Sequence, residues 1–338
     1  MGVLAGAKRA QAPVRPRVMA GMRPTGRMHV GHLLGALRNF IALVQDHDCF
    51  YEIADLHALT TAFERSERVT SDVREMVIDW LAAGLDPARC TIYLQSRIPE
   101  ISELTALLAM ITPVSWLERV PTYKDQINAL GAQVATYGFL GYPVLQTVDI
   151  AIMKAQRVPV GQDQLPHLEL SREIVRRFNH LYGNTLIEPE PILSATPNVP
   201  GTDGRKMSKS YDNTLMLSDT PAETTAKVKL MYTDPLKIHK TDPGRPELCP
   251  VFFFHGVFNE RNALDIAQRC RTGQLGCVAN KADMAAHLNA ALAPIRERRQ
   301  QAMRRPAVVD EIIGEGTKRA RTIAQATLAE VKQAMRLS

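Results

Sequence analysis

The first half of the chain alternates apolar runs that suit buried strands with amphipathic helical patterns, and this alternation most restricts the possible fold. Residues 18–20 predict a strand, glycine and proline interrupt residues 21–26, and apolar side chains then recur at helical spacing over 33–44. Further strands are predicted at 49–54, 91–95 and 158–161. The pattern predicts an α/β fold, a Rossmann-like parallel sheet with helices on both faces and a ligand site beyond the carboxyl ends of the strands.

The amino-acid composition indicates the class of protein and its cellular compartment, but it does not indicate a reaction. The 338 residues are 45% apolar and 22% charged, which is typical of a globular protein. No run of about 18 apolar residues predicts a membrane span. Five scattered cysteines do not resemble a disulfide framework and favour the cytoplasm. The formal charge of +6 favours a polyanionic partner without identifying it.

Three parts are expected along the chain. Residues 1–17 predict a flexible tail, because they contain no apolar core long enough for a secretory signal. Residues 18–214 hold the alternating strands and helices. From residue 215 to 338 the patterns are helical throughout, which predicts a C-terminal all-helical domain.

A first motif, PTGRMHVGH at residues 24–32, places two imidazoles at the start of the first helix. Gly26 and Gly31 let the backbone close over a nucleotide, and the helix start adds unpaired N–H donors. His29 and His32 at this spacing could instead cap a helix or bind a metal. Other nucleotidyltransferases carry a similar segment, so the motif alone is moderately specific.

A second motif, GRKMSKS at residues 204–210, places two ammonium groups on a loop. Alone it could be a solvated basic loop. Together the motifs can hold a nucleoside triphosphate, because attack on an α-phosphate needs positioning and stabilisation of the charge that builds on pyrophosphate. We expect His29, His32, Lys206 and Lys209 to be catalytic in this sense.

With these two motifs the sequence resembles a class I aminoacyl-tRNA synthetase. Three further segments resemble the tryptophanyl-tRNA synthetase family, of bacterial type: DLHALT at 55–60, YPxxQxxD at 142–149 and VPVGQDQxxH at 158–167. The resemblance runs from about residue 18 to the end of the chain. It implies ATP-dependent activation of L-tryptophan, transfer to tRNA(Trp), magnesium bound with ATP, and a homodimer in the cytoplasm with a dimer-forming insertion in residues 18–214.

The resemblance also implies site residues. Asp149 would accept the indole N–H, Val158 and Val160 would form a wall against the ring, and Tyr142 and Gln164 would hold the ammonium and carboxylate of the substrate. The expected tryptophan-binding residues are Tyr142, Gln146, Asp149, Val158, Val160, Gln164 and His57. The expected ATP-binding residues are Arg23, Pro24, Thr25, Gly31, His32, Gly161, Gln162, Asp163, Val199, Lys206, Met207, Ser208, Lys209 and Ser210.

Three positions depart from the family pattern. Gln146 stands where many tryptophan enzymes have Met, Arg23 where Gln is usual, and Gln162 where Glu is usual. Gln146 and Asp149 would also suit a phenol, so a tyrosine enzyme is the alternative within the class. A paralogue that binds nucleotide, amino acid or RNA without catalysis is the alternative outside it, and the presence of both histidines and both lysines disfavours it.

The C-terminal half carries two more features. Cys249, Cys270 and Cys277 have the spacing of an iron–sulfur site in some bacterial relatives, but the fourth position is Asn280, so we expect buried structural cysteines rather than a cluster. Arginines would form an electrostatic stripe for tRNA, and the resemblance makes 215–338 the anticodon-binding domain. The stripe is Arg296, Arg298, Arg299, Arg304 and Arg305, followed by Lys318, Arg319 and Arg321. Residues 110–117 could supply apolar dimer surface or core.

Overall fold

A computed structural model gives the fold and describes residues 15–120, 131, 133, 135–193 and 198–337. The predicted tail therefore lies mostly outside the described residues, as do residues 121–130, 132, 134 and 194–197 of the predicted catalytic domain. Arg17 was assigned to the tail, but it is the first residue of strand β1. Its backbone N–H donates to the side chain of Gln156 over 2.6 Å, and its side chain pairs with Asp48. The tail thus ends at least one residue earlier than predicted.

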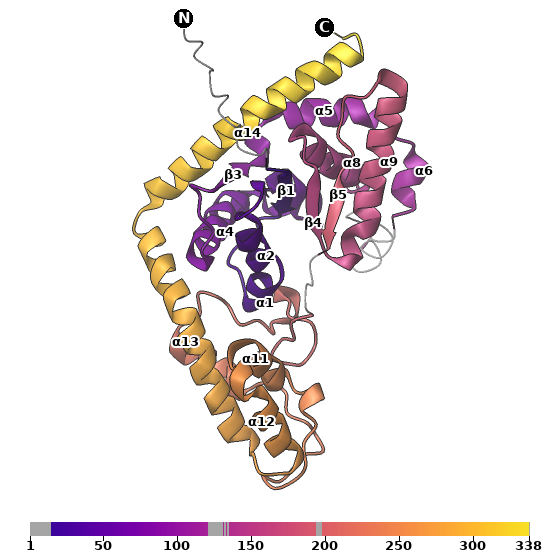
Figure 1. Cartoon of the computed structure of the whole chain (residues 1–338). Helices are drawn as coiled ribbons and strands as arrows, with labels where there is room; N and C mark the ends of the chain where they lie inside the picture. Colours follow the sequence, from indigo (N-terminus) through magenta and orange to yellow (C-terminus); the bar gives the residue numbers. More distant parts are fainter. Residues whose placement is uncertain (1–14, 121–130, 132, 134, 194–197, 338) are drawn as a thin grey trace, which may run out of the picture.

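Five parallel strands form one sheet in the order β3-β2-β1-β4-β5 (Figure 1). The strands are β1 (Arg17–Met22), β2 (Asp48–Ile53), β3 (Cys90–Leu94), β4 (Arg157–Val160) and β5 (Glu190–Leu193). The predicted parallel sheet is confirmed, and each predicted strand is found with shifted ends. Strand β5 was not predicted, because its four residues lie at the edge of the sheet and are exposed or only partly buried, so they do not form a buried apolar run.

The strand order reverses beside β1. Strands β2 and β3 follow on one side of β1, whereas β4 and β5 follow on the other. At such a reversal, the connections leave the two neighbouring strands in opposite directions and open a crevice at their carboxyl ends. The residues that follow β1 and β4, Arg23 and Gly161, therefore face one ligand site.

The two faces of the sheet are both apolar, as expected for a sheet buried between helices. Along β2, Tyr51 and Ile53 belong to one core cluster, which includes side chains from α1, α2, α4 and α13, whereas Phe50 belongs to a second cluster with α5, α8 and α9. The helices of this region are α1 (Val30–His32), α2 (Arg38–Leu43), α3 (Asp55–Ala62), α4 (Val69–Ala83), α5 (Pro99–Ala109), α6 (Val114–Glu118), α8 (Tyr137–Ile152) and α9 (Leu165–Tyr182).

The region after residue 215 is helical, as predicted, and among the described residues it contains no strand. Its helices are α10 (Pro221–Lys229), α11 (Pro250–Phe258), α12 (Glu260–Arg271), α13 (Cys277–Met303) and α14 (Pro306–Ala334). Its core is continuous with that of the sheet, because Phe254 and Met284 belong to the same cluster as Val18. Figure 1 shows α13 leading from the lower helices back to the sheet region, where α14 passes β3.

Helix α14 covers the edge of the sheet at β3. The Leu94 N–H at the end of β3 donates to the Thr317 hydroxyl over 3.2 Å, and a β-carbon placed on Gly316 would lie 1.9 Å from the Ile92 carbonyl oxygen. The contact therefore requires glycine at position 316. Covering an edge strand removes a row of backbone groups that could pair with another chain.

Candidate active site

The segment 24–32 folds into a tight turn that leads into α1. Gly26 has a φ of +79°, and a β-carbon there would lie 2.9 Å from a carboxylate oxygen of Asp72 in α4. Two residues further on, the N–H of Met28 donates to buried Asp79 over 2.6 Å. The path of the turn is therefore set by the positive φ that glycine tolerates at position 26 and by the hydrogen bond to the Asp79 carboxylate.

His29 and His32 lie at the start of α1 with their rings stacked, 3.7 Å between centroids. The backbone N–H of His29 donates to Nδ1 of His32 over 3.2 Å, so the neutral His32 ring carries its proton on Nε2. Burial lowers the pKa of His29 to about 3, with contributions from His32 and Lys209, and burial with Lys209 lowers the pKa of His32 to about 4. The imidazoles are therefore neutral at pH 7 in the free protein, and their N–H groups can donate to phosphate.

The segment 204–210 is held in shape by Asn213, which is 1% exposed. The Asn213 side chain accepts from the Ser208 N–H over 2.8 Å and donates to the Lys206 carbonyl over 3.1 Å. Met207 is buried, and its N–H donates to the Val199 carbonyl. The loop thus exposes Lys206 while its backbone is anchored on both sides of the lysine.

The structure brings the two motifs together. Nζ of Lys209 donates to the Thr25 carbonyl oxygen over 2.6 Å. Backbone hydrogen bonds also join the segments, from Val30 to Leu215 over 2.8 Å and from Leu217 to Met28 over 2.9 Å. The segment that carries the imidazoles and the segment that carries the amines are therefore neighbours in the fold.

A pocket of about 420 Å³ opens beside these loops at the carboxyl ends of β1 and β4. All seven expected tryptophan-binding residues line it, and so do Arg23 and Gly161 of the expected ATP site. Pro24 is buried, Gln162 is exposed, and the side chain of Asp163 lies outside what the structure describes. The structure therefore places an amino-acid-sized cavity next to the paired motifs.

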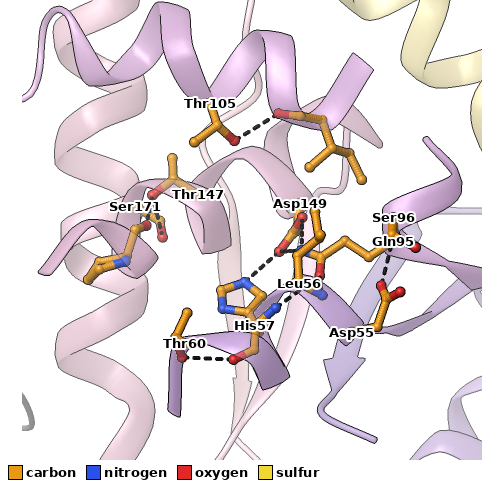
Figure 2. A network of polar contacts seen from close by, with 12 residues as sticks. Asp55, Leu56, His57, Thr60, Gln95, Ser96, Thr105, Thr147, Asp149 and Ser171 are labelled. Carbon is orange, nitrogen blue, oxygen red and sulfur yellow. Dashed lines mark hydrogen bonds and ion pairs between the residues drawn. The ribbon is translucent and has the colours of Figure 1, made fainter. Parts of the chain in front are cut away.

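Asp149 lies at the centre of a hydrogen-bond network in this pocket. Figure 2 shows that the side chains of His57 and Gln95 point toward it. Nε2 of His57 donates to one carboxylate oxygen over 2.9 Å, and Nε2 of Gln95 donates to both, over 2.9 and 3.0 Å. Lys154, the next basic residue along the chain, pairs with Glu330.

Gln95 is a site residue that sequence reasoning missed, because it was read only as the end of a strand. It is fully buried, and its Oε1 accepts from the backbone N–H groups of Leu56 and His57 at the start of α3. These contacts orient the amide so that its nitrogen faces Asp149. Glu52 and Asn213 were missed too, and a buried polar residue within an apolar strand is the signal that identifies Glu52.

The predicted arginine stripe is wrong for Arg299. This side chain is 4% exposed and pairs with Asp79 and Glu75 of α4, because its position on α13 faces the sheet region. Other members have partners as well: Arg298 donates to the Ala82 carbonyl, and Arg321 to Glu100. Arg304 and Arg305 remain exposed, between α13 and α14.

Cys249, Cys270 and Cys277 line one small cavity of about 20 Å³ together with Asn280, and each is partly rather than fully buried, which differs from the expectation of buried cysteines. Burial raises the pKa of Cys249 and of Cys270. Among the described residues, no group of three or more His, Cys, Asp or Glu side chains is arranged to hold a metal ion. Within the same ranges, no helix is long and apolar enough to cross a bilayer.

Comparison with known proteins shows the family to which the chain belongs. Residues 12–293 match the family model of class I tRNA synthetases for tryptophan and tyrosine (W and Y), and the chain belongs to this family. Among curated relatives, it is 46% identical to the tryptophan–tRNA ligase of Thermotoga maritima, over 95% of this chain and 99% of the relative. It is 43% identical to that of Aquifex aeolicus, over 95% and 100%.

A solved structure of a tryptophan enzyme has a similar fold. The tryptophanyl-tRNA synthetase of Campylobacter jejuni, complexed with ADP and tryptophan, superposes with a TM-score of 0.86 at 30% identity, covering 94% of this chain and 99% of that one. The particular members that the chain resembles are therefore tryptophan enzymes.

Proposed function

We propose that the protein is a tryptophan–tRNA ligase, which activates L-tryptophan with ATP and transfers it to tRNA(Trp) in translation. The observation that carries this function is the pocket around Asp149 beside the joined loops of Thr25 and Lys209, in a chain whose full-length relatives are tryptophan enzymes. The catalytic machinery for activation and the cavity for an amino acid thus share one crevice.

In the activation step, a carboxylate oxygen of tryptophan attacks the α-phosphorus of ATP while the bond from that phosphorus to the bridging oxygen breaks. Pyrophosphate leaves with the additional negative charge. Lys206 and Lys209 balance this charge, and the neutral rings of His29 and His32 donate hydrogen bonds to phosphate oxygens. Catalysis therefore rests on positioning and electrostatics, and it needs no general base.

The nucleotide would lie across the start of α1, where Gly31 permits close approach, since a β-carbon there would meet the His29 ring at 2.9 Å. Thr25 and Lys209 would flank the phosphates, with Gly161 near the end of β4. Magnesium would enter on the phosphates of ATP, neutralising the charge shared by the leaving group.

In the amino-acid pocket, Asp149 would accept the indole N–H, and the side chains of Val158 and Val160 would pack against the ring. Tyr142 and Gln164 would bind the ammonium and carboxylate groups. Phenylalanine would leave Asp149 with an unmade hydrogen bond, a loss of about 1 to 3 kcal/mol. His57 would hold Asp149 in place.

For tRNA, we propose that the helical region 215–338 binds the anticodon and that residues 18–214 form the catalytic domain. The exposed arginines Arg304 and Arg305 are available for phosphate contacts, which position a nucleic acid without reading its sequence. The setting would be the cytoplasm, where translation requires the enzyme.

We also propose a homodimer. An apolar cavity of about 570 Å³ is lined by α3, α5, α6 and α8 and by exposed Val114 and Tyr137. Segment 110–117 was expected to supply either dimer surface or core, and it contains both kinds of residue. Val114 is 57% exposed, whereas Leu117 is buried. An apolar surface of this kind favours a second copy of the chain.

The function is tested by ATP–pyrophosphate exchange with each of the amino acids. Tryptophan alone should support exchange, and aminoacylation should be confined to tRNA(Trp). Exchange driven by tyrosine would overturn the assigned substrate, and no exchange at all would support a binding module. Asp149→Ala should raise the KM for tryptophan far more than that for ATP.

A further inference from the structure

A second carboxyl group lies beside Asp149 in the tryptophan pocket. Glu52 is the fifth residue of β2, it is 0% exposed, and it lines the same cavity. Its β-strand neighbours are Gly21 in β1 and Tyr93 in β3. A β-carbon on Gly21 would lie 3.3 Å from a Glu52 carboxyl oxygen, so glycine leaves room for this side chain.

The surroundings of Glu52 do not suit a carboxylate anion. Neither of its oxygens has a well-aligned hydrogen bond from a described residue, and the buried hydroxyl of Tyr93 nearby has none either. The charged groups that act on Glu52 are acids, Asp149 from α8 and Asp55 from α3. Burial raises its pKa well above the usual range and the charge of Asp149 raises it further, whereas the neighbouring Tyr93 hydroxyl lowers it by less. These surroundings favour the neutral carboxylic acid over the anion.

A neutral carboxylic acid needs an acceptor for its proton, and Asp149 is in contact with it. The two Asp149 oxygens already accept from Nε2 of His57 and, shared between both oxygens, from Nε2 of Gln95. With Gln95 counted as one donor, the Glu52 hydroxyl is the third donor on about four lone-pair sites, which leaves one site for the substrate.

We propose that Glu52 is a positioning residue for tryptophan: its carboxylic acid donates a hydrogen bond to Asp149, and the pair holds one proton and one negative charge. Three donors from β2, α3 and the end of β3 then fix Asp149 so that its remaining lone pair faces the indole N–H. The inference rests on the proposed function, since the substrate defines what Asp149 accepts.

The test compares two replacements of Glu52. Glu52→Gln keeps the shape and a hydrogen-bond donor, whereas Glu52→Leu keeps the volume and removes the donor. We expect Glu52→Gln to hold the KM for tryptophan within about threefold, and Glu52→Leu to raise it about tenfold or more at unchanged KM for ATP. Glu64→Gln, at an exposed acid, is the matched control and should change neither constant.

The pH profile distinguishes positioning from packing. At alkaline pH the wild-type pair loses its shared proton, and two anions then repel each other, so kcat/KM for tryptophan should fall while that for ATP does not. Glu52→Gln cannot lose a proton there and should lack the fall. The proposal is overturned if Glu52→Gln loses as much as Glu52→Leu, or if it keeps the alkaline fall.

A measurement on the wild-type protein covers the case in which Glu52→Leu does not fold. The infrared carbonyl stretch of a protonated carboxylic acid should be present at neutral pH and absent in Glu52→Gln; its absence from the wild type would contradict the proposal. Wild-type exchange with tryptophan tests the proposed function separately, because it does not depend on where the proton lies.

Discussion

Arg299 of α13 and Asp79 of α4 form a buried ion pair, with 3.1 Å between Nε and Oδ1. The other oxygen of Asp79 accepts the N–H of Met28, one residue before His29. The C-terminal helical region is therefore connected to the nucleotide loop through two side chains. Burial raises the pKa of Asp79 to about 6 although Arg299 opposes this.

Removing one partner of this pair should be strongly destabilising. Arg299→Met leaves Asp79 buried without its cation, and we expect the free energy of unfolding to fall by about 3 to 5 kcal/mol. Urea denaturation of wild type and variant measures this change in the free energy of unfolding. Arg304→Met, at an exposed arginine near the end of the same helix, should stay within about 0.5 kcal/mol. Equal effects of the two replacements would show that the pair contributes nothing.

Lys209 should act on the activation step. Lys209→Met removes the ammonium next to Thr25, so kcat for ATP–pyrophosphate exchange should fall by about 10²- to 10³-fold. Lys318→Met, which removes an exposed lysine paired with Glu315, is the control and should leave exchange unchanged. A higher KM for ATP at unchanged kcat would instead mean that Lys209 only binds the ground state.

The two histidines predict acid sensitivity of the free protein. Their folded-state pKa values, about 3 and about 4, lie below the ordinary value of 6.5. Between about pH 6.5 and 4 the unfolded chain therefore binds more protons, and stability falls as the pH is lowered through this window. A double variant, His29→Gln with His32→Gln, should lose less stability than wild type between pH 7 and pH 5 in urea denaturation. An identical loss would refute this assignment.

Gly316 should be essential to the contact between α14 and β3. Gly316→Ala places a methyl group against the Ile92 carbonyl and forces the helix away, at a cost of about 1 to 3 kcal/mol or more. Gly314→Ala, on the same helix with nothing within 4 Å of the added carbon, should be neutral or stabilise by up to about 1 kcal/mol. Thermal unfolding of both variants measures the difference, and similar melting temperatures would contradict the packing.

Local patterns were sufficient for the sheet and for the motif loops. Apolar runs and glycine stops placed four of the five strands found in the described residues, because most residues of β1, β2 and β3 are buried and Val158 and Val160 of β4 are buried. The helix after His29 was predicted as regular, but it contains a π-helical turn at Leu33–Leu37, which apolar spacing does not reveal.

Features that depend on contacts between residues far apart in the chain could not be predicted from local sequence patterns. Charge alone suggested that Arg299 contacts nucleic acid, and only the position of α4 shows that its partners are carboxylates. Likewise, Gln95 and Glu52 become site residues only when α8 brings Asp149 over the sheet. Their roles arise from the approach of elements that are far apart in the chain.

Helix α14 also matters for how the protein is made. The hydrogen bond from Leu94 to Thr317 spans 223 positions of the chain. While a ribosome synthesises that stretch, the nascent sheet has an open border at β3, which invites pairing with other polypeptides. A premature stop codon or a frameshift in this interval would release a product that keeps that border open, and such a product should aggregate or require a chaperone.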